Sequence, residues 1–139
     1  MAYLPDAMPL PNTEEIDTKE YWARVQNKEF VVQQCVDCDT FTFPPGPICY
    51  NCQSFNHKLT AVEGKGQIYS YIIAIHPVHP SLVERGSYNV AIVELPEVGN
   101  VRFVGNVIDA ADDELYVGMP VKATFEERGG VTMVQWLKA

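Results

Sequence analysis

The chain has 139 residues, of which 47% are hydrophobic and 20% charged. These proportions are typical of a soluble globular protein and exclude an intrinsically disordered one, and the length suits one modest domain or a small core with a satellite. The 18 acidic and 10 basic residues give a formal net charge of -8, with the basic residues scattered singly. Because nucleic-acid binding depends on neutralising phosphates with cations, this balance argues against DNA or RNA as a partner.

The first 16 residues contain three prolines and no hydrophobic period, so we expect an extended or partly disordered arm. This stretch lacks the positive start and continuous apolar segment of a secretory signal. The longest aliphatic run, residues 72–75, is far too short to span a bilayer. We therefore expect a cytoplasmic protein without a membrane partner, in a reducing compartment where structural disulfides are rare.

A short helix is predicted over residues 18–27. Asp17 is the expected N-cap, and Glu20 stands at the capping-box position. An apolar stripe follows at helical spacing, formed by Tyr21, Trp22 and Val25. Such a stripe usually packs on the core; the alternative is that this helix docks a partner or lines a ligand channel.

The remaining chain has the composition of short strands, which predicts a mainly β fold. Three short strands surround the cysteines, at residues 30–34, 40–43 and 58–62. Five longer strands follow, at residues 67–76, 88–95, 100–108, 120–127 and 131–137. Between the third and fourth of these, residues 109–118 are polar and suit one helical turn. Five strands with a helical connection after the third are typical of an OB-fold barrel.

Individual strands carry further information about their surroundings. Residues 121–126 alternate between apolar and polar side chains, as in a strand whose polar face, including Glu126, meets water. Residues 90–93 are apolar on both faces, so this strand is expected to be buried twice, either between sheet layers or against another chain. Gly105 is predicted to mark a bend or bulge where the barrel turns a corner.

All four cysteines lie in the stretch CVDCDTFTFPPGPICYNC, residues 35–52. The pairs Cys35/Cys38 and Cys49/Cys52 each put two sulfurs on one tight knuckle, and four thiolates suit a tetrahedral zinc ion. No βαβ unit accompanies the pairs, so a thioredoxin-type redox motif is disfavoured. A closed four-sulfur site leaves no position for substrate, which predicts structural zinc. The alternative is a single iron, as in a rubredoxin-like electron carrier.

The metal is expected to fold the segment around it. About 30 residues cannot bury a sufficient core, whereas zinc binding at such sites contributes on the order of 10 kcal/mol or more. Asp39 and Gln53 follow the knuckles, where the backbone often needs φ > 0 and glycine is common. Aspartate tolerates that conformation and glutamine does so poorly.

No catalytic residue is predicted. His76 and His79 lie in a proline-rich loop and His57 at the ribbon's exit, and each is expected to be a solvated or packing residue rather than an acid or base. The chain has no catalytic-triad signature, phosphate-binding glycine loop or dinucleotide fingerprint, and its thiols are assigned to the metal. We expect that this chain alone is not an enzyme.

The order of motifs along nearly the whole chain, from Tyr21 onward, resembles a known family. Its members are the acyl-CoA-associated zinc-ribbon/OB-fold proteins, long grouped as a domain of unknown function. The motifs that carry the resemblance are Gln34-Cys35, Phe43-Pro44-Pro45, Pro47-Ile48-Cys49, Gly66, Tyr69-Ser70-Tyr71, His79-Pro80, Val90 to Leu95, Gly105-Asn106 and Gly118-Met119-Pro120-Val121. Departures are Gly46, where arginine is frequent, Asn89, where an apolar residue is usual, and the missing knuckle glycines.

The resemblance implies a small companion subunit of a thiolase, thiolase-like aldolase or hydratase that processes CoA thioesters. Catalytic residues would then lie on the larger partner of a hetero-oligomer, and acyl-CoA would be a ligand of the complex, with contact residues on this chain unknown. We divide the chain into an N-terminal arm and helix (1–28), a zinc ribbon (29–63) and an OB-fold (64–139). The alternatives are a nucleic-acid-binding zinc-ribbon/OB-fold protein and the rubredoxin-like electron carrier.

Overall fold

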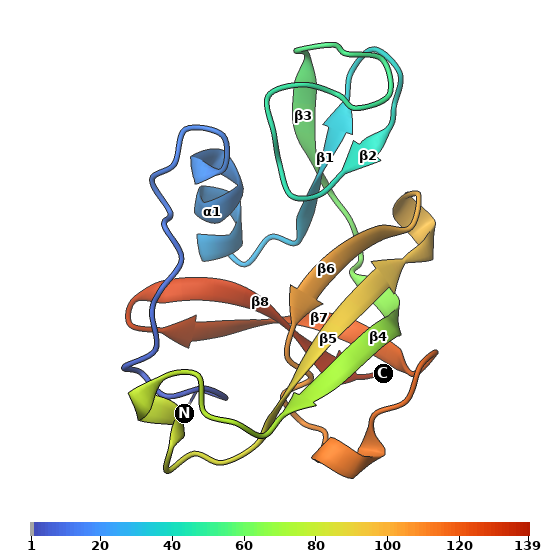
Figure 1. The fold of residues 1–139 in the computed structure, drawn as a ribbon. Coiled ribbons are helices and arrows are strands. Elements are labelled where there is room, and N and C mark those ends of the chain that lie inside the picture. Colours follow the sequence, from blue (N-terminus) through green and yellow to red (C-terminus); the bar gives the residue numbers. More distant parts are fainter. Residues whose placement is uncertain (1) are drawn as a thin grey trace.

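The computed structural model describes residues 2–139, which form one α-helix and two antiparallel sheets (Figure 1). The helix, α1, spans Lys19–Gln26. The smaller sheet has the order β2-β1-β3 and stands above the rest of the molecule in Figure 1. Its strands are β1 (Val31–Cys35), β2 (Phe41–Thr42) and β3 (His57–Ala61).

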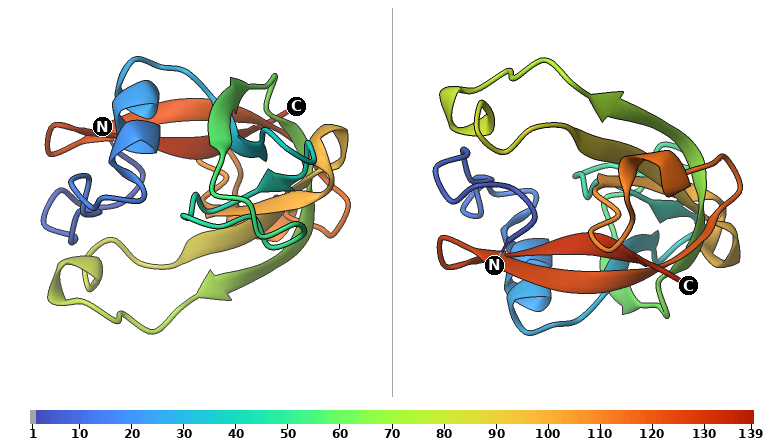
Figure 2. Two further views of the ribbon diagram at one scale, coloured as in Figure 1. Left: turned by 90° about the horizontal axis from the view of Figure 1, so that it is seen from above. Right: turned by 90° about the horizontal axis from the view of Figure 1, so that it is seen from below.

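The larger sheet has five strands in the order β6-β5-β4-β7-β8 and curls into a nearly closed barrel (Figure 2). The strands are β4 (Lys65–Ala74), β5 (Tyr88–Leu95), β6 (Val101–Gly105), β7 (Pro120–Arg128) and β8 (Val131–Lys138). Short 3₁₀ turns lie in the connections, at η1 (Pro80–Leu82), η2 (Pro96–Val98) and η3 (Asp112–Glu114). The prediction of a mainly β chain with a helix, a ribbon and a five-stranded OB-type barrel is confirmed.

The predicted start of the helix is wrong in its detail. The N-cap is Thr18 rather than Asp17, and no side chain accepts a capping hydrogen bond there. The backbone supplies the partner instead, because the amides of Thr18 and Lys19 both donate to the carbonyl of Glu15, at 3.0 and 2.8 Å. A turn before the helix thus replaces the predicted capping box.

The predicted bulge at Gly105 is also wrong. The register irregularity lies in β4, between Ile68 and Ser70, where Tyr69 is the additional residue. Gly105 ends β6, and a Cβ atom there would lie 3.0 Å from the Trp136 ring. The glycine is therefore required by close packing on a buried aromatic side chain rather than by a bend.

Buried amide side chains close the barrel between β6 and β8, where the regular ladder is missing. One isolated parallel bridge joins Val107 to Trp136 across this seam. Gln135 accepts from the backbone amide of Asn106 and donates to its side chain, both at 2.8 Å. Asn89 accepts from the Val107 amide at 2.8 Å and donates to the Val107 carbonyl at 3.0 Å. Side-chain hydrogen bonds thus complete the ring of strands.

The N-terminal arm is extended and packs on the barrel. The Tyr3 hydroxyl accepts from the backbone and side-chain amides of Asn89, at 3.0 and 2.9 Å. The Arg128 guanidinium donates to three backbone carbonyls of the arm, those of Pro5, Met8 and Pro9. These contacts fix the arm across β5 and β7.

Aromatic packing joins the ribbon to the barrel. Phe43, which follows β2, stacks on Phe103 of β6 with ring centroids 3.6 Å apart and planes inclined by 16°. Val32 of β1 is fully buried in the main core together with Phe103, and Tyr21 of α1 packs on Phe43 and Val31. The ribbon, helix and barrel therefore share their apolar packing.

The strand that was predicted to be buried on both faces is covered on one. Ala91 and Val93 of β5 lie in the core, whereas Val90 and Ile92 are half-buried on the opposite face. Their cross-strand neighbours on that face, Ile72 and Val104, are 61% and 67% exposed. No described part of this chain forms a second sheet layer over them.

We predict that Asn89→Val destabilises the protein by about 2–4 kcal/mol, because it leaves the Val107 amide and carbonyl without partners and removes one of the two hydrogen bonds to the Tyr3 hydroxyl. Urea unfolding measures this effect. Asn27→Val, at an exposed position, is the control and should change the unfolding free energy by less than about 0.5 kcal/mol. Equal midpoints for the two variants would contradict the role of the amide seam.

Candidate functional site

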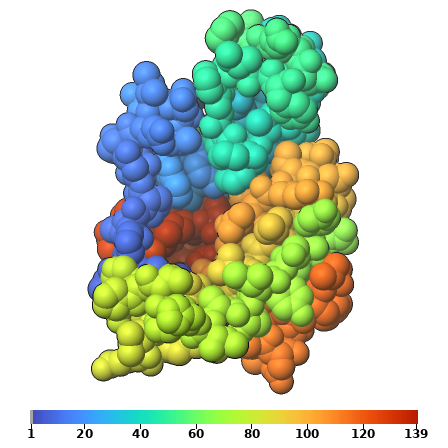
Figure 3. Space-filling view, viewed as in Figure 1, coloured from blue at the N-terminus to red at the C-terminus, as the bar shows by residue number. Residues whose placement is uncertain are grey.

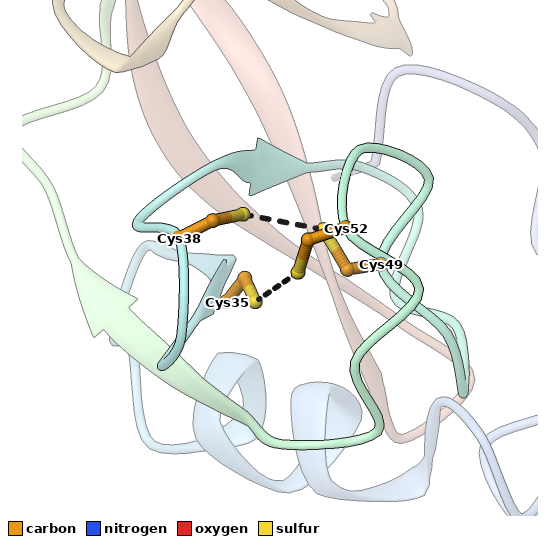
Figure 4. Close-up of side chains that lie close together, drawn as sticks. All are labelled: Cys35, Cys38, Cys49 and Cys52. Atoms are coloured by element: carbon orange, nitrogen blue, oxygen red, sulfur yellow. Dashed lines mark hydrogen bonds between the residues drawn. The ribbon is translucent and has the colours of Figure 1, made fainter.

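The fold gathers the four cysteines at one point, as Figure 4 shows. Cys35 ends β1 and Cys38 lies in the following turn, while Cys49 and Cys52 come from the long loop between β2 and β3. Their sulfur atoms all lie within 4.8 Å of one another. The Sγ atoms of Cys35 and Cys52 are 3.6 Å apart, as are those of Cys38 and Cys49.

These distances fit one tetrahedral ion. A zinc ion with Zn–S bonds of about 2.3 Å places its sulfur ligands about 3.8 Å apart. The same four residues are those that the spacing predicts as ligands, and in residues 2–139 they form the one cluster of three or more potential metal-binding side chains. Four sulfur ligands would fill the coordination sphere, so an ion here suits a structural role.

The two knuckles have the same backbone geometry. The amide of Asp39 donates to the Cys35 carbonyl at 3.0 Å, and the amide of Gln53 donates to the Cys49 carbonyl at 2.9 Å. Both Asp39 and Gln53 have φ of 63°, the left-handed conformation expected at these positions. Gln53 holds this conformation despite its side chain, so the second knuckle is regular.

Polar side chains tie the knuckles together around the sulfurs. The Asp37 carboxylate accepts from the Ser54 hydroxyl and, at 3.2 Å, from the Asn56 side chain. Hydrogen bonds with the side chains of Thr40 and Asn51 lower the pKa of the Cys38 thiol to about 6. The neighbouring sulfurs, Cys38 first, raise the pKa of the Cys52 thiol to about 12. All four thiols would therefore be deprotonated together only with a cation bound between them.

The histidines do not join this site. His79 caps η1 by accepting from the Ser81 amide at 3.2 Å, while His57 and His76 are exposed. These positions agree with the packing and solvated roles expected for them. Within residues 2–139 no helix has the length and apolar character that crossing a membrane requires.

A second feature escaped the sequence analysis. Glu126, which was assigned to a water-facing side of β7, is only 9% exposed, and Arg128 is 6% exposed. The arm covers both: the Tyr3 amide donates to Glu126 Oε2 at 3.1 Å, and Arg128 binds arm carbonyls. Both residues line a cavity of about 310 Å³ between the arm, α1, the ribbon and the barrel seam. No local pattern reveals this, because the covering segment lies 120 residues away.

We predict one zinc ion per chain, measurable by inductively coupled plasma mass spectrometry on the purified protein. Cys52→Ser should sharply lower the zinc content and the melting temperature, since it removes one of four ligands. Tyr50→Ser is the control, because Tyr50 lies on the same loop and is 73% exposed. A stoichiometric iron content with a red colour, or full stability without any metal, would overturn the assignment.

We also predict that Gln53→Gly stabilises the protein, by about 0.5–1 kcal/mol, because glycine adopts positive φ without steric cost. Asp39→Gly is the matched comparison at the other knuckle and should gain less, since aspartate tolerates this conformation. Thermal unfolding of the zinc-loaded variants measures both effects. A lower melting temperature for Gln53→Gly would contradict this account of the knuckle.

Comparison with known proteins identifies two consecutive domains. Residues 22–58 match the family model described as the ChsH2 rubredoxin-like zinc ribbon domain, and residues 59–126 match that of the ChsH2 C-terminal OB-fold domain. Among curated proteins, the chain is 40% identical over 105 residues to a probable enoyl-CoA hydratase alpha subunit of Thermomonospora curvata. That match covers 76% of this chain but only 32% of the hydratase subunit, so the chain spans about a third of that relative.

Two further relatives have nearly the length of this chain. A DUF35 domain-containing scaffold protein of Methanocaldococcus jannaschii is 28% identical over 106 residues, which cover 75% of this chain and 73% of the scaffold protein. Among solved structures, a chain of the Ltp2-ChsH2(DUF35) aldolase is 35% identical and superposes with a TM-score of 0.80, covering 94% of this chain and 98% of that one. The chain therefore belongs to the ChsH2-type DUF35 family, in which a rubredoxin-like zinc ribbon precedes an OB-fold domain.

Proposed function

We propose that this chain is a non-catalytic accessory subunit of a larger enzyme that acts on acyl-CoA thioesters. The observation that carries the proposal is an apolar sheet face that this chain leaves uncovered. Family membership supports it, since relatives are named as a hydratase alpha subunit, a scaffold protein and a component of an aldolase. The partner would be thiolase-like, as in thiolases and related aldolases, or hydratase-like, and would supply the catalytic residues.

The docking surface is the outer sheet face, which we define as Ile72, Val90, Ile92 and Val104. Ile72 pairs with Val90 across β4 and β5, and Ile92 pairs with Val104 across β5 and β6, so the four side chains are contiguous. The ion pair between Arg102 and Glu94, at 3.3 Å, neutralises the charges on the same face. A contiguous apolar surface of this kind favours contact with another protein.

The proposed occupant is the catalytic subunit rather than a second copy of this chain. Each copy carries a formal charge of -8, so two copies would repel one another, whereas a neutral or basic partner would not. The hydratase relative also contains about two thirds of its length beyond the matched region. A separate polypeptide could provide the corresponding part here.

The four cysteine thiolates would hold a structural zinc ion in this subunit. The ion would link the knuckle at the end of β1 to the knuckle in the loop before β3. It would thereby fix both knuckles relative to these two strands. With four thiolates and Zn²⁺ counted, the formal charge becomes about -10. Such a chain repels the phosphates of CoA, so the partner would bind the nucleotide end and this subunit would meet the acyl end.

We predict that affinity-tagged chain, purified from its native cells, brings down a thiolase, aldolase or hydratase in fixed stoichiometry. Mass spectrometry identifies the partner, and a thioester turnover assay with and without this chain measures its contribution. We expect turnover to fall at least tenfold when the chain is removed. Full activity of the partner alone would refute the accessory role.

The docking surface is tested with Ile72→Glu, which should abolish the stable complex because a carboxylate would be desolvated in the interface. Ile16→Glu is the matched control, since Ile16 is 81% exposed on the N-terminal side of α1. Size-exclusion chromatography of the co-expressed subunits compares the two. Retention of the Ile72→Glu complex at wild-type affinity would exclude this face, provided the partner is still bound by the unmodified chain.

A further inference from the structure

The end of the zinc ribbon that points away from the barrel exposes apolar side chains. We define this ribbon tip as residues 36–39 and 47–56, which belong to the loops after β1 and before β3. It stands at the top of Figure 3, in blue-green, beyond the helix and the barrel. Within residues 2–139, the two most exposed aromatic side chains are here, Tyr50 at 73% and Phe55 at 71%, and the side chains of Val36 and Ile48 are exposed as well.

Backbone hydrogen bonds bring these four residues together around the sulfurs. The Val36 amide donates to the carbonyl of the residue that follows Phe55, at 3.0 Å. Cys49 lies between Ile48 and Tyr50 in the sequence. Its amide donates to the carbonyl of the residue that precedes Phe55, at 2.9 Å. The apolar side chains therefore come from one small region beside the metal site.

The ribbon tip adds nothing to the apolar cores. Among the described residues, none from 36–39 or 47–56 belongs to a core cluster or packs against one. The ribbon joins the barrel through its base instead, where Val32 and Phe43 are packed. A metal in the two knuckles would hold the tip in one conformation. Its exposed side chains would then be preorganised for contact with a partner, at a low cost in conformational entropy.

The charge of the ribbon tip is negative. No lysine or arginine occurs between Lys28 and Lys58, whereas Asp37 and Asp39 are both exposed in the first knuckle. Four thiolates with one Zn²⁺ would add a net charge of about -2. Nucleic acid and a second copy of this acidic chain would therefore be repelled, whereas a basic protein segment would be attracted.

The outer sheet face has different chemistry. Its side chains are aliphatic, and the charges beside them are paired between Arg102 and Glu94. At the ribbon tip the exposed side chains include two aromatic rings, which also attract lysine and arginine through cation–π contacts. No ion pair among the described residues includes Asp37 or Asp39. The outer sheet face therefore suits a neutral apolar surface and the ribbon tip a basic one, which indicates two different partners.

We propose that the ribbon tip binds a basic amphipathic segment of a second protein, distinct from the catalytic subunit on the outer sheet face. In this arrangement apolar side chains of the segment pack on Tyr50 and Phe55, and its lysine or arginine side chains lie beside the Asp39 carboxylate. The inference goes beyond the accessory role, because it adds another partner at a separate surface.

Site-specific photo-crosslinking in the native cells identifies this partner. The whole chain carries p-benzoylphenylalanine in place of Phe55 or, as the control, in place of Tyr116, which is exposed in the loop after η3. Mass spectrometry should find, from position 55 only, a crosslinked peptide that is rich in lysine or arginine and does not belong to the catalytic subunit. An acidic peptide, a peptide of the catalytic subunit, the same peptides from both positions, or no crosslink would overturn the proposal.

The affinity of the zinc-loaded chain for the crosslinked peptide, made synthetically, tests the two kinds of contact. Phe55→Ser should weaken binding at least tenfold. Asp39→Asn should weaken it at least threefold at low salt and less at high salt, because salt screens the charge. Asparagine tolerates the φ of 63° at this position, so this variant removes the charge and keeps the backbone.

Tyr116→Ser and Asp113→Asn are the matched controls at exposed positions near η3, and each should change the affinity less than twofold. Losses as large as those of the tip variants would overturn the proposal. The catalytic subunit should still co-purify with Phe55→Ser and Asp39→Asn, at the wild-type zinc content. Its loss from either variant would contradict the assignment of the two surfaces to different partners, while the accessory role is decided separately by turnover of the complex.

Discussion

The structure depends on bringing two cysteine knuckles from distant parts of the ribbon to one point. Cys35 ends β1, whereas Cys49 and Cys52 lie in the loop that precedes β3. Because their sulfur atoms lie within 4.8 Å of one another, the path of the chain between the two knuckles is fixed. That loop begins at Phe43, whose ring stacks on Phe103 of the barrel. The geometry of the sulfurs is thereby coupled to the packing between ribbon and barrel, and to the cavity of about 310 Å³ that Phe43 and Phe103 line.

Burial of polar groups shapes the other half of the molecule. The seam between β6 and β8 relies on Asn89, Asn106 and Gln135, whose amides are satisfied by one another and by backbone. Glu126 and Arg128 are buried by the arm but only partly satisfied. A buried polar network whose groups are all hydrogen-bonded rigidifies a fold, whereas buried polar groups without partners cost free energy. The two networks therefore have different roles. The first closes the barrel, and the second holds the N-terminal arm against β7.

Local sequence signals predicted much of this arrangement. The C-x-x-C pairs and their spacing located the four-sulfur cluster, and alternation with strand composition placed the strands to within a few residues. The resemblance identified the family and its order of domains, which the comparisons confirm. The errors came from contacts that the local pattern does not show, two of them with residues far away in the sequence. Gly105 is required by Trp136, Glu126 is covered by Tyr3, and the helix start is satisfied by a preceding turn.

Backbone amide hydrogen exchange on the zinc-loaded and zinc-stripped chain tests the central claim most directly. The account predicts that stripping removes protection from β1 to β3 and also lowers it in β6 and α1, which pack on Phe43, while β4, β5 and β7 keep theirs. Unchanged protection in the ribbon after complete metal removal would contradict the claim that the four sulfurs organise this part of the molecule around an ion.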